Sequence, residues 1–384
     1  MMGTGASGSR RGGIPAGLIG MLALVVGVER FVADHLFGFT GDPQRLAWRM
    51  SERAIRGEAA RAEVLCLGDS LVKFGILPRV LEAGLGRSAY NLAIPGAQPA
   101  ASYFLFRRAL TSGARPRAVV VDFYSKVLAA APRINRCFWP DLLSFGELLE
   151  LSCQARDIRL FNKSAVGWLL PSFRDRGEIR RAVLATVKGE GRQLRDTLSA
   201  NLRNGLANRG ATVAPVVLPS PVDHETGSRI DPSRQRRWAP ARPNAEFVRR
   251  FLDLARDHGI PVFWVLPPTS PRWQERIERR GEEAAYLRFV RATRARSPNV
   301  VILDGRHTGY GRELFCDPVH LNRAGASAFT TDVASAIALH LAGSGPRDSW
   351  VALPAYRDRP PVRFVEDLVQ SEIAVRSAES TRLR

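Results

Sequence analysis

The chain has 384 residues, 45% of them hydrophobic, which is enough for one large core and allows one to three domains. Its 56 Lys and Arg residues against 37 Asp and Glu give a formal net charge of +19. That charge favours anionic partners, or it is simply a solvated basic surface. Nucleic acid is the less favoured partner, because the arginines are scattered and no nucleic-acid-binding motif is present. No cysteine or histidine cluster has zinc spacing and no glycine-rich stretch has a phosphate-loop pattern, so we predict neither a metal nor a nucleotide cofactor.

Residues 1–42 contain the pattern from which we predict the cellular compartment of the protein. Arg10 and Arg11 precede an uncharged run over residues 12–28, and no cleavage site follows it. This pattern predicts an uncleaved N-terminal membrane anchor helix that leaves the rest of the chain outside the cytoplasm. The run is short for a membrane span of ~20 residues. A buried or amphipathic helix packed on the domain is therefore the alternative.

After a helical linker over residues 43–60, apolar strands alternate with amphipathic helices. Strands are expected at residues 64–67, 89–92, 118–123, 261–266 and 300–303. The helices between and after them are expected at residues 77–85, 100–110, 244–259, 282–295 and 322–341, with Asn244 as an N-cap. Such alternation predicts an α/β fold, a doubly wound five-stranded parallel sheet covered on both faces.

The proposed domain covers residues 43–345 and carries an insertion over residues 126–240, after the third strand. The insertion is either a cap over the carboxyl edge of the sheet or a packing elaboration. Cys137 and Cys153 lie in it and would form a disulfide in an oxidising compartment, whereas Cys66 and Cys316 are expected to be buried. Residues 346–384 are polar and interrupted by prolines, so we expect a partly disordered tail.

Two short motifs contain the candidate catalytic residues. The first apolar strand ends in Gly68-Asp69-Ser70, and Asp317-Pro-Val-His320 precedes the last helix. A serine hydroxyl needs an imidazole to take its proton and a carboxylate to orient that imidazole, so Ser70, His320 and Asp317 form a candidate triad. The carboxyl ends of parallel strands meet at one edge, which brings both motifs together.

Each of these residues also has a structural interpretation. Ser70 would be a helix N-cap, and His320 would cap the next helix. Asp69 is expected to hold its turn through backbone N–H groups. Lys73 is either a substrate contact or a solvated turn residue, and His307 is expected to be unpaired or at the surface.

The Gly-Asp-Ser and Asp-x-x-His blocks resemble the SGNH (GDSL-type) hydrolase superfamily. The resemblance covers residues 62–127 and 244–341. It implies a flavodoxin-like strand order 2-1-3-4-5 and an oxyanion hole formed by the backbone of Ser70 and Gly96. It also implies an esterase or O-acyltransferase acting on acyl, above all acetyl, groups of a carbohydrate such as a cell-surface polysaccharide.

One block departs from this family. The family's Gly-x-Asn-Asp, which supplies an Asn side chain to the oxyanion hole, corresponds here to residues 118–126, which contain no Asn. The candidate replacement donor is Ser125 or Tyr124, or Asn135 from the following segment, with Ser125 preferred. A non-catalytic protein of this fold that binds a glycan or a surface is the second hypothesis.

Overall fold

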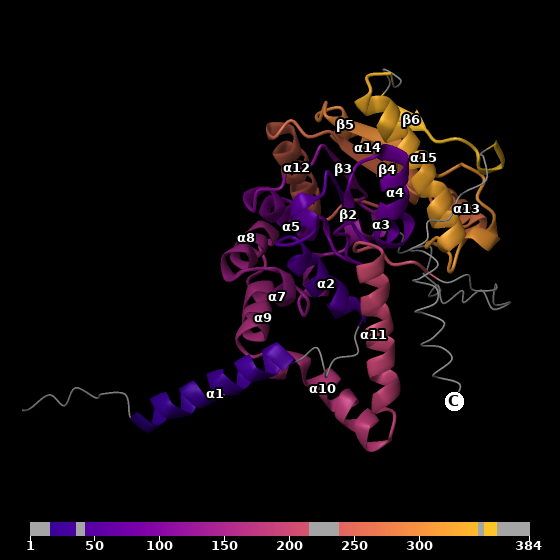
Figure 1. The fold of residues 1–384 in the computed structure, drawn as a ribbon. Coiled ribbons are helices and arrows are strands. Elements are labelled where there is room, and N and C mark those ends of the chain that lie inside the picture. The colour runs from indigo at the N-terminus through magenta and orange to yellow at the C-terminus, as the bar shows by residue number, and fades with distance from the viewer. Residues whose placement is uncertain (1–15, 36–42, 215–237, 345–348, 359–384) are drawn as a thin grey trace, which may run out of the picture.

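The computed structural model describes residues 16–35, 43–214, 238–344 and 349–358 (Figure 1). Its centre is a sheet of six parallel strands in the order β2-β1-β3-β4-β5-β6. The strands are β1 (Val64–Leu67), β2 (Ala89–Asn91), β3 (Ala118–Val121), β4 (Val262–Leu266), β5 (Val300–Asp304) and β6 (Trp350–Ala352). The predicted α/β class is confirmed, and the first five strands follow the order 2-1-3-4-5.

The predicted number of five strands is wrong, because β6 lies in the segment that we expected to be a partly disordered tail. Its three residues pair in parallel with β5, with Ile302 opposite Trp350. Trp350 Nε1 also donates a hydrogen bond to Asp304 Oδ2 at 3.1 Å. A three-residue strand between polar segments gives too short a pattern to be found in the sequence. Residues 359–384 lie outside the described residues.

Helices cover both faces of the sheet, as the apolar strands predict. One core contains Leu65 and Leu67 of β1 with α5 (Pro99–Thr111), α12 (Arg242–Asp257) and α14 (Glu282–Arg294). The other contains Val64 and Cys66 with α3 (Ser70–Gly75), α4 (Pro78–Leu85) and α15 (Arg323–Leu341). Successive side chains of a strand point to opposite faces, so each strand contributes to both cores.

The insertion after β3 is helical. It contains α6 (Ser125–Ala129), η3 (Pro132–Asn135), α7 (Trp139–Leu142), α8 (Phe145–Ala155), α9 (Ile158–Leu169), α10 (Pro171–Val187) and α11 (Gly191–Ala207). Helices α10 and α11 form a hairpin that projects away from the sheet (Figure 1). The remaining elements are α2 (Pro43–Ala54), η2 (Ala59–Arg61), α13 (Pro271–Arg279), η5 (Arg312–Leu314) and η6 (Tyr356–Asp358).

Buried charges fasten this insertion to α2. The Arg45 guanidinium pairs with Asp175 at 2.5 Å and with Asp141 at 3.1 Å, and all three side chains are almost fully buried. Trp48 packs edge-on against Trp139 with ring centroids 5.1 Å apart. The linker helix is therefore part of the domain that carries the insertion.

The start of α12 differs from the prediction. Its first residue is Arg242 with Ala241 as N-cap, so the assignment of Asn244 as N-cap is wrong. Asn244 Nδ2 instead donates to the carbonyls of Leu128 and Ala130 at 2.8 and 2.7 Å. Its amide thus satisfies carbonyl groups at the end of α6, a contact that local sequence cannot reveal.

Helix α1 (Ala16–His35) carries the apolar run at the N-terminus. Its Glu29 accepts a hydrogen bond from the Ser172 backbone N–H of α10 at 2.8 Å. In the part of the chain that the structure describes, no helix combines the length and the hydropathy needed to cross a membrane. Residues 1–15 and 36–42 of the expected anchor lie outside that part.

Candidate functional site

Ser70 begins helix α3 directly after the turn that ends β1. Gly68 has φ +131°, and a Cβ there would lie 2.1 Å from Asp122 Oδ1, so this position requires glycine. Asp69 is the N-cap, and its side chain accepts from the Leu71 backbone N–H at 2.8 Å. The structural interpretation of Ser70 as the N-cap is therefore wrong, and the role expected for Asp69 is confirmed.

His320 and Asp317 lie on a short loop between η5 and α15. His320 Nδ1 is 2.5 Å from Asp317 Oδ2, while Asp317 Oδ1 accepts the backbone N–H groups of Val319 and His320 at 2.8 and 2.9 Å. Burial alone would raise the pKa of Asp317. The hydrogen bond from His320 and the two backbone donors outweigh burial and hold that pKa below its usual value.

The imidazole is also held by packing. The Phe74 ring lies against it with centroids 5.1 Å apart, and Asn322 caps α15 in place of His320. His320 Nε2 is buried and has no hydrogen-bond partner among the described residues. The free nitrogen is therefore the one opposite the carboxylate, as a general base requires. His320 Nε2 therefore makes no hydrogen bond to Ser70 Oγ in this structure, and such a bond often becomes well aligned only when substrate binds.

Gly96 forms the next turn along the sheet edge, after β2. Its φ is +68°, and Asn135 Nδ2 donates to its carbonyl at 2.8 Å and to Gln98 Oε1 at 2.6 Å. Both amide hydrogens of Asn135 are thus used within the protein. Asn135 supports the Gly96 turn, and it is not free to donate into the cavity described next.

Ser70, Gly96 and His320 line one cavity of about 430 Å³. Asn201, Gly205 and Thr212 of the insertion also line this cavity, so the insertion contributes to it. Ser125 lies elsewhere: it lines a neighbouring pocket together with Leu71 and Asp122. Of the predicted oxyanion donors, the structure brings Ser70 and Gly96 to the cavity and leaves out Ser125 and Asn135.

Lys73 also lines this cavity, one helical turn after Ser70. It is only 3% exposed, so the interpretation of a solvated turn residue is wrong. Desolvation by burial lowers the pKa of its ammonium to about 8. The spacing of Ser70 and Lys73 was visible in the sequence, whereas the burial depends on the insertion.

Two buried carboxyl groups lie behind the nucleophile turn. Asp69 and Asp122 are each 2% exposed, and Asp122 Oδ1 accepts the Asp69 backbone N–H at 3.0 Å. Burial raises the pKa of Asp69 to about 6, and burial together with the nearby Asp69 charge raises the pKa of Asp122 well above its usual range. Burial therefore favours the protonated forms of both carboxyl groups, and their nearness couples the two titrations.

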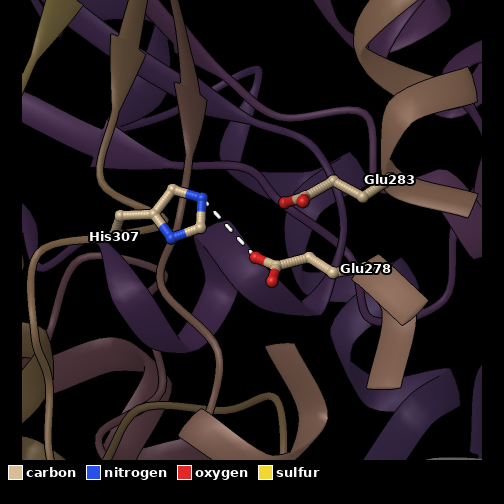
Figure 2. A group of neighbouring side chains, drawn as sticks. All are labelled: Glu278, Glu283 and His307. Atoms are coloured by element: carbon tan, nitrogen blue, oxygen red, sulfur yellow. Dashed lines mark ion pairs between the residues drawn. The ribbon is translucent and has the colours of Figure 1, made fainter. Parts of the chain in front are cut away.

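A second group of titratable side chains lies outside the cavity. Glu278, Glu283 and His307 come close enough to hold a metal ion (Figure 2), with His307 Nε2 3.6 Å from Glu278 Oε1. Glu283 Oε1, however, accepts from Arg306 at 2.7 Å, and Gln274 Nε2 bonds both carboxylates. These contacts already neutralise Glu283 and satisfy the cluster. His307 lies at the surface, as one of the two expectations for it has it, and is near Glu278.

The cysteines take no part in the cavity. Cys66 is buried as expected, and burial raises its pKa. Cys316 is half-buried, and burial raises its pKa to about 12. Cys137 and Cys153 are exposed free thiols, so the structure does not contain the disulfide considered for them.

Comparison with protein-family models and with curated proteins finds no match to this chain. The geometry of the cavity is therefore the basis on which a function can be assigned. Sequence reasoning missed three features of it: the burial of Lys73, the carboxyl pair of Asp69 and Asp122, and the contribution of Asn201 from α11.

Proposed function

We propose that the protein is a serine esterase or O-acyltransferase of the SGNH type. In this mechanism Ser70 Oγ attacks an acyl carbonyl while His320 Nε2 takes the hydroxyl proton. The tetrahedral intermediate collapses, His320 returns the proton to the leaving alcohol, and an acyl-Ser70 ester remains. Water, or a sugar hydroxyl, then attacks that ester with His320 again as base. Asp317 orients the imidazole and stabilises its charged form.

The observation that carries this proposal is that Ser70, Gly96 and His320 line the same cavity although they follow different strands. Backbone N–H groups of Ser70 and Gly96 would stabilise the oxyanion. Asn135 supports the proposal indirectly, because it fixes the peptide around Gly96. The cavity has room for an acyl group and part of its carrier. By the family resemblance we propose an acetyl ester of a carbohydrate as substrate.

Covalent labelling tests this function. The full chain is incubated with a fluorophosphonate probe, which reacts with an activated serine, and the labelled peptide is identified by mass spectrometry. We expect one label, on Ser70, that is absent from Ser70→Ala and retained in the matched control Ser125→Ala. A label that persists in Ser70→Ala, or no label on the folded wild-type protein, would contradict the proposal.

A non-catalytic glycan-binding protein is the second candidate. It is favoured because neither Ser125 nor Asn135 supplies a third oxyanion donor. Ser125 lines another pocket, and the Asn135 amide is bonded to Gly96 and Gln98. Losing one donor can cost ~2.7–4 kcal/mol of transition-state stabilisation. Glycan binding by a wild-type protein that resists the fluorophosphonate probe would favour this candidate.

We also propose that the domain acts outside the cytoplasm, held at the membrane by its N-terminal segment. Support comes from Arg10 and Arg11 before the uncharged run, and from the exposed apolar side chains of α1, such as Leu24 and Phe31. A reporter enzyme fused after Gly343 should be active only outside the cytoplasm of a bacterial host. Reporter activity confined to the cytoplasm would refute this location.

A further inference from the structure

The buried lysine beside the nucleophile has no countercharge. Among the described residues, Lys73 Nζ makes neither an ion pair nor a hydrogen bond, and burial alone accounts for the lowered pKa of this group. Burying an ammonium group without a partner is costly, and proteins rarely retain one. Because a pKa of about 8 still leaves most of the group protonated at pH 7, the cavity contains a positive charge.

The rest of the lining agrees with an anionic occupant. Among the described residues, no Asp or Glu lines the cavity, and the only titratable side chain there besides Lys73 is His320. Asn201 of α11 also lines the cavity, and its amide group has no partner among the described residues. A cation and an amide donor that both face one space form a site for a carboxylate, sulfate or phosphate.

The backbone holds Lys73 in place. It lies three residues after Ser70, and side chains of a helix lean toward its N-terminus, so Lys73 leans toward the turn that bears Ser70. The Lys73 carbonyl accepts the Thr212 backbone N–H at 3.0 Å, which fastens the insertion over this turn. An acidic group bound at Lys73 would therefore lie next to the reacting ester.

We propose that the cavity selects esters whose carrier has an acidic group, a carboxylate, sulfate or phosphate monoester, which binds Lys73 with help from Asn201. This inference rests on the proposed function for its ester, but the anion site itself does not depend on catalysis. The anion site specifies which class of ester is the substrate, whereas the triad alone does not.

Two measurements on the full chain test the anion site. The first compares the melting temperature in sodium sulfate and in sodium chloride at equal ionic strength. The second compares kcat/KM for 4-acetoxybenzoate with kcat/KM for phenyl acetate, which lacks the carboxylate. Both are applied to wild type, Lys73→Met, Lys73→Arg and Lys163→Met, the last a matched change of an exposed lysine on α9. Methionine retains the length of the side chain and removes its charge.

We expect sulfate to raise the melting temperature of wild type and Lys163→Met, and to lose this effect in Lys73→Met. The ratio of kcat/KM for the two esters should fall about tenfold or more in Lys73→Met, as loss of a charged contact predicts. Lys73→Arg should retain most of the ratio, since it retains the charge.

Other results would overturn the inference. If Lys73→Met lowers kcat/KM for both esters by the same factor, Lys73 acts on the oxyanion and not on a substrate anion. A sulfate effect that persists in Lys73→Met would place the bound anion elsewhere. If sulfate binding depends on Lys73 but no ester is turned over, the proposed esterase function fails and the anion site stands. If the esters are turned over but the ratio of their kcat/KM values is unchanged in Lys73→Met, the esterase function stands and the anion site fails.

Discussion

The two walls of the cavity are built in different ways. The sheet wall bears Ser70, Gly96 and His320 on turns directly after strands or before a core helix, and backbone hydrogen bonds such as Ile94 N to Gly68 O at 3.0 Å connect these turns. The insertion wall bears Asn201 and is part of a helical hairpin that projects from the domain (Figure 1).

The insertion wall is joined to the sheet wall by backbone hydrogen bonds such as Thr212 N to Lys73 O at 3.0 Å, and side chains brace it internally. Asn204 bonds both backbone groups of Val213, with its Nδ2 donating at 2.9 Å and its Oδ1 accepting at 3.0 Å. The sheet wall bears the reacting groups, so we expect it to position them, whereas the insertion wall bears none of them, so we expect it to shape the space for substrate. Changes on the first should alter kcat, and changes on the second should alter KM.

The largest expected effect is on the nucleophile and base. Ser70→Ala and His320→Ala should each lower kcat for a short-chain aryl ester by roughly 10³ or more, and the double variant should lose little beyond either one, because triad members act as a unit. Steady-state kinetics with purified protein measures this. His307→Ala serves as the control and should retain most activity. Substantial turnover by Ser70→Ala would exclude the proposed mechanism.

A smaller loss is expected when the support of Gly96 is removed. Asn135→Ala deprives two acceptors, the Gly96 carbonyl and Gln98, of their donor. The Gly96 N–H should then be less well placed, and kcat should fall by roughly 10² with little change in KM, as for loss of an oxyanion donor. Asn299→Ala, which removes a bond to the Ile260 carbonyl at the opposite end of β4, is the control. Equal kcat values for both variants would argue against a role in the oxyanion hole.

The carboxyl pair behind Ser70 predicts a dependence of stability on pH. The pKa of Asp69 is raised from 3.8 to about 6, so the folded protein binds a proton more tightly than the unfolded chain. The stability that this proton gives is complete below pH 3.8 and is lost as the pH rises through about 6. Asp122→Asn removes the second charge and leaves Oδ1 to accept the Asp69 N–H.

In this variant the raised pKa of Asp122 no longer contributes, so the fall in the free energy of unfolding between pH 5 and pH 8 should be smaller than in wild type. Urea unfolding at both pH values measures the difference. Asp157→Asn, at the N-cap of α9, should retain the wild-type pH dependence. The same fall in Asp122→Asn and wild type would mean that Asp122 does not contribute to this pH dependence.

The smallest effect is expected on the insertion wall. Asn201→Ala should raise KM for 4-acetoxybenzoate roughly fivefold and leave kcat nearly unchanged, because a neutral hydrogen bond to substrate contributes about 1 kcal/mol. Arg203→Ala, an exposed position on the same helix, is the matched control. A drop in kcat by the same factor as the rise in KM would mean that the insertion wall affects catalysis as well as substrate binding.

The sequence predicted the scaffold well and the details of the cavity less well. Apolar strands and their bounds were readable, because buried parallel strands form uninterrupted apolar runs. Ser70, Gly96 and His320 were expected at one edge for the same reason, and the structure brings them to one cavity. Ser125 was expected there too, but α6 turns it toward the pocket lined by Leu71 and Asp122.

By itself, the sequence determined the α/β class, the order of elements along the chain, and the two motifs that supply a hydroxyl, an imidazole and a carboxylate. These are local signals: periodicity, turn chemistry and spacing. Only the tertiary structure decided that β6 joins the sheet, that Lys73 is buried with no countercharge among the described residues, and that Asp69 and Asp122 are buried beside each other. Each of these depends on segments far apart in the chain, because burial and dielectric environment are set by what packs around a residue and not by its neighbours in sequence.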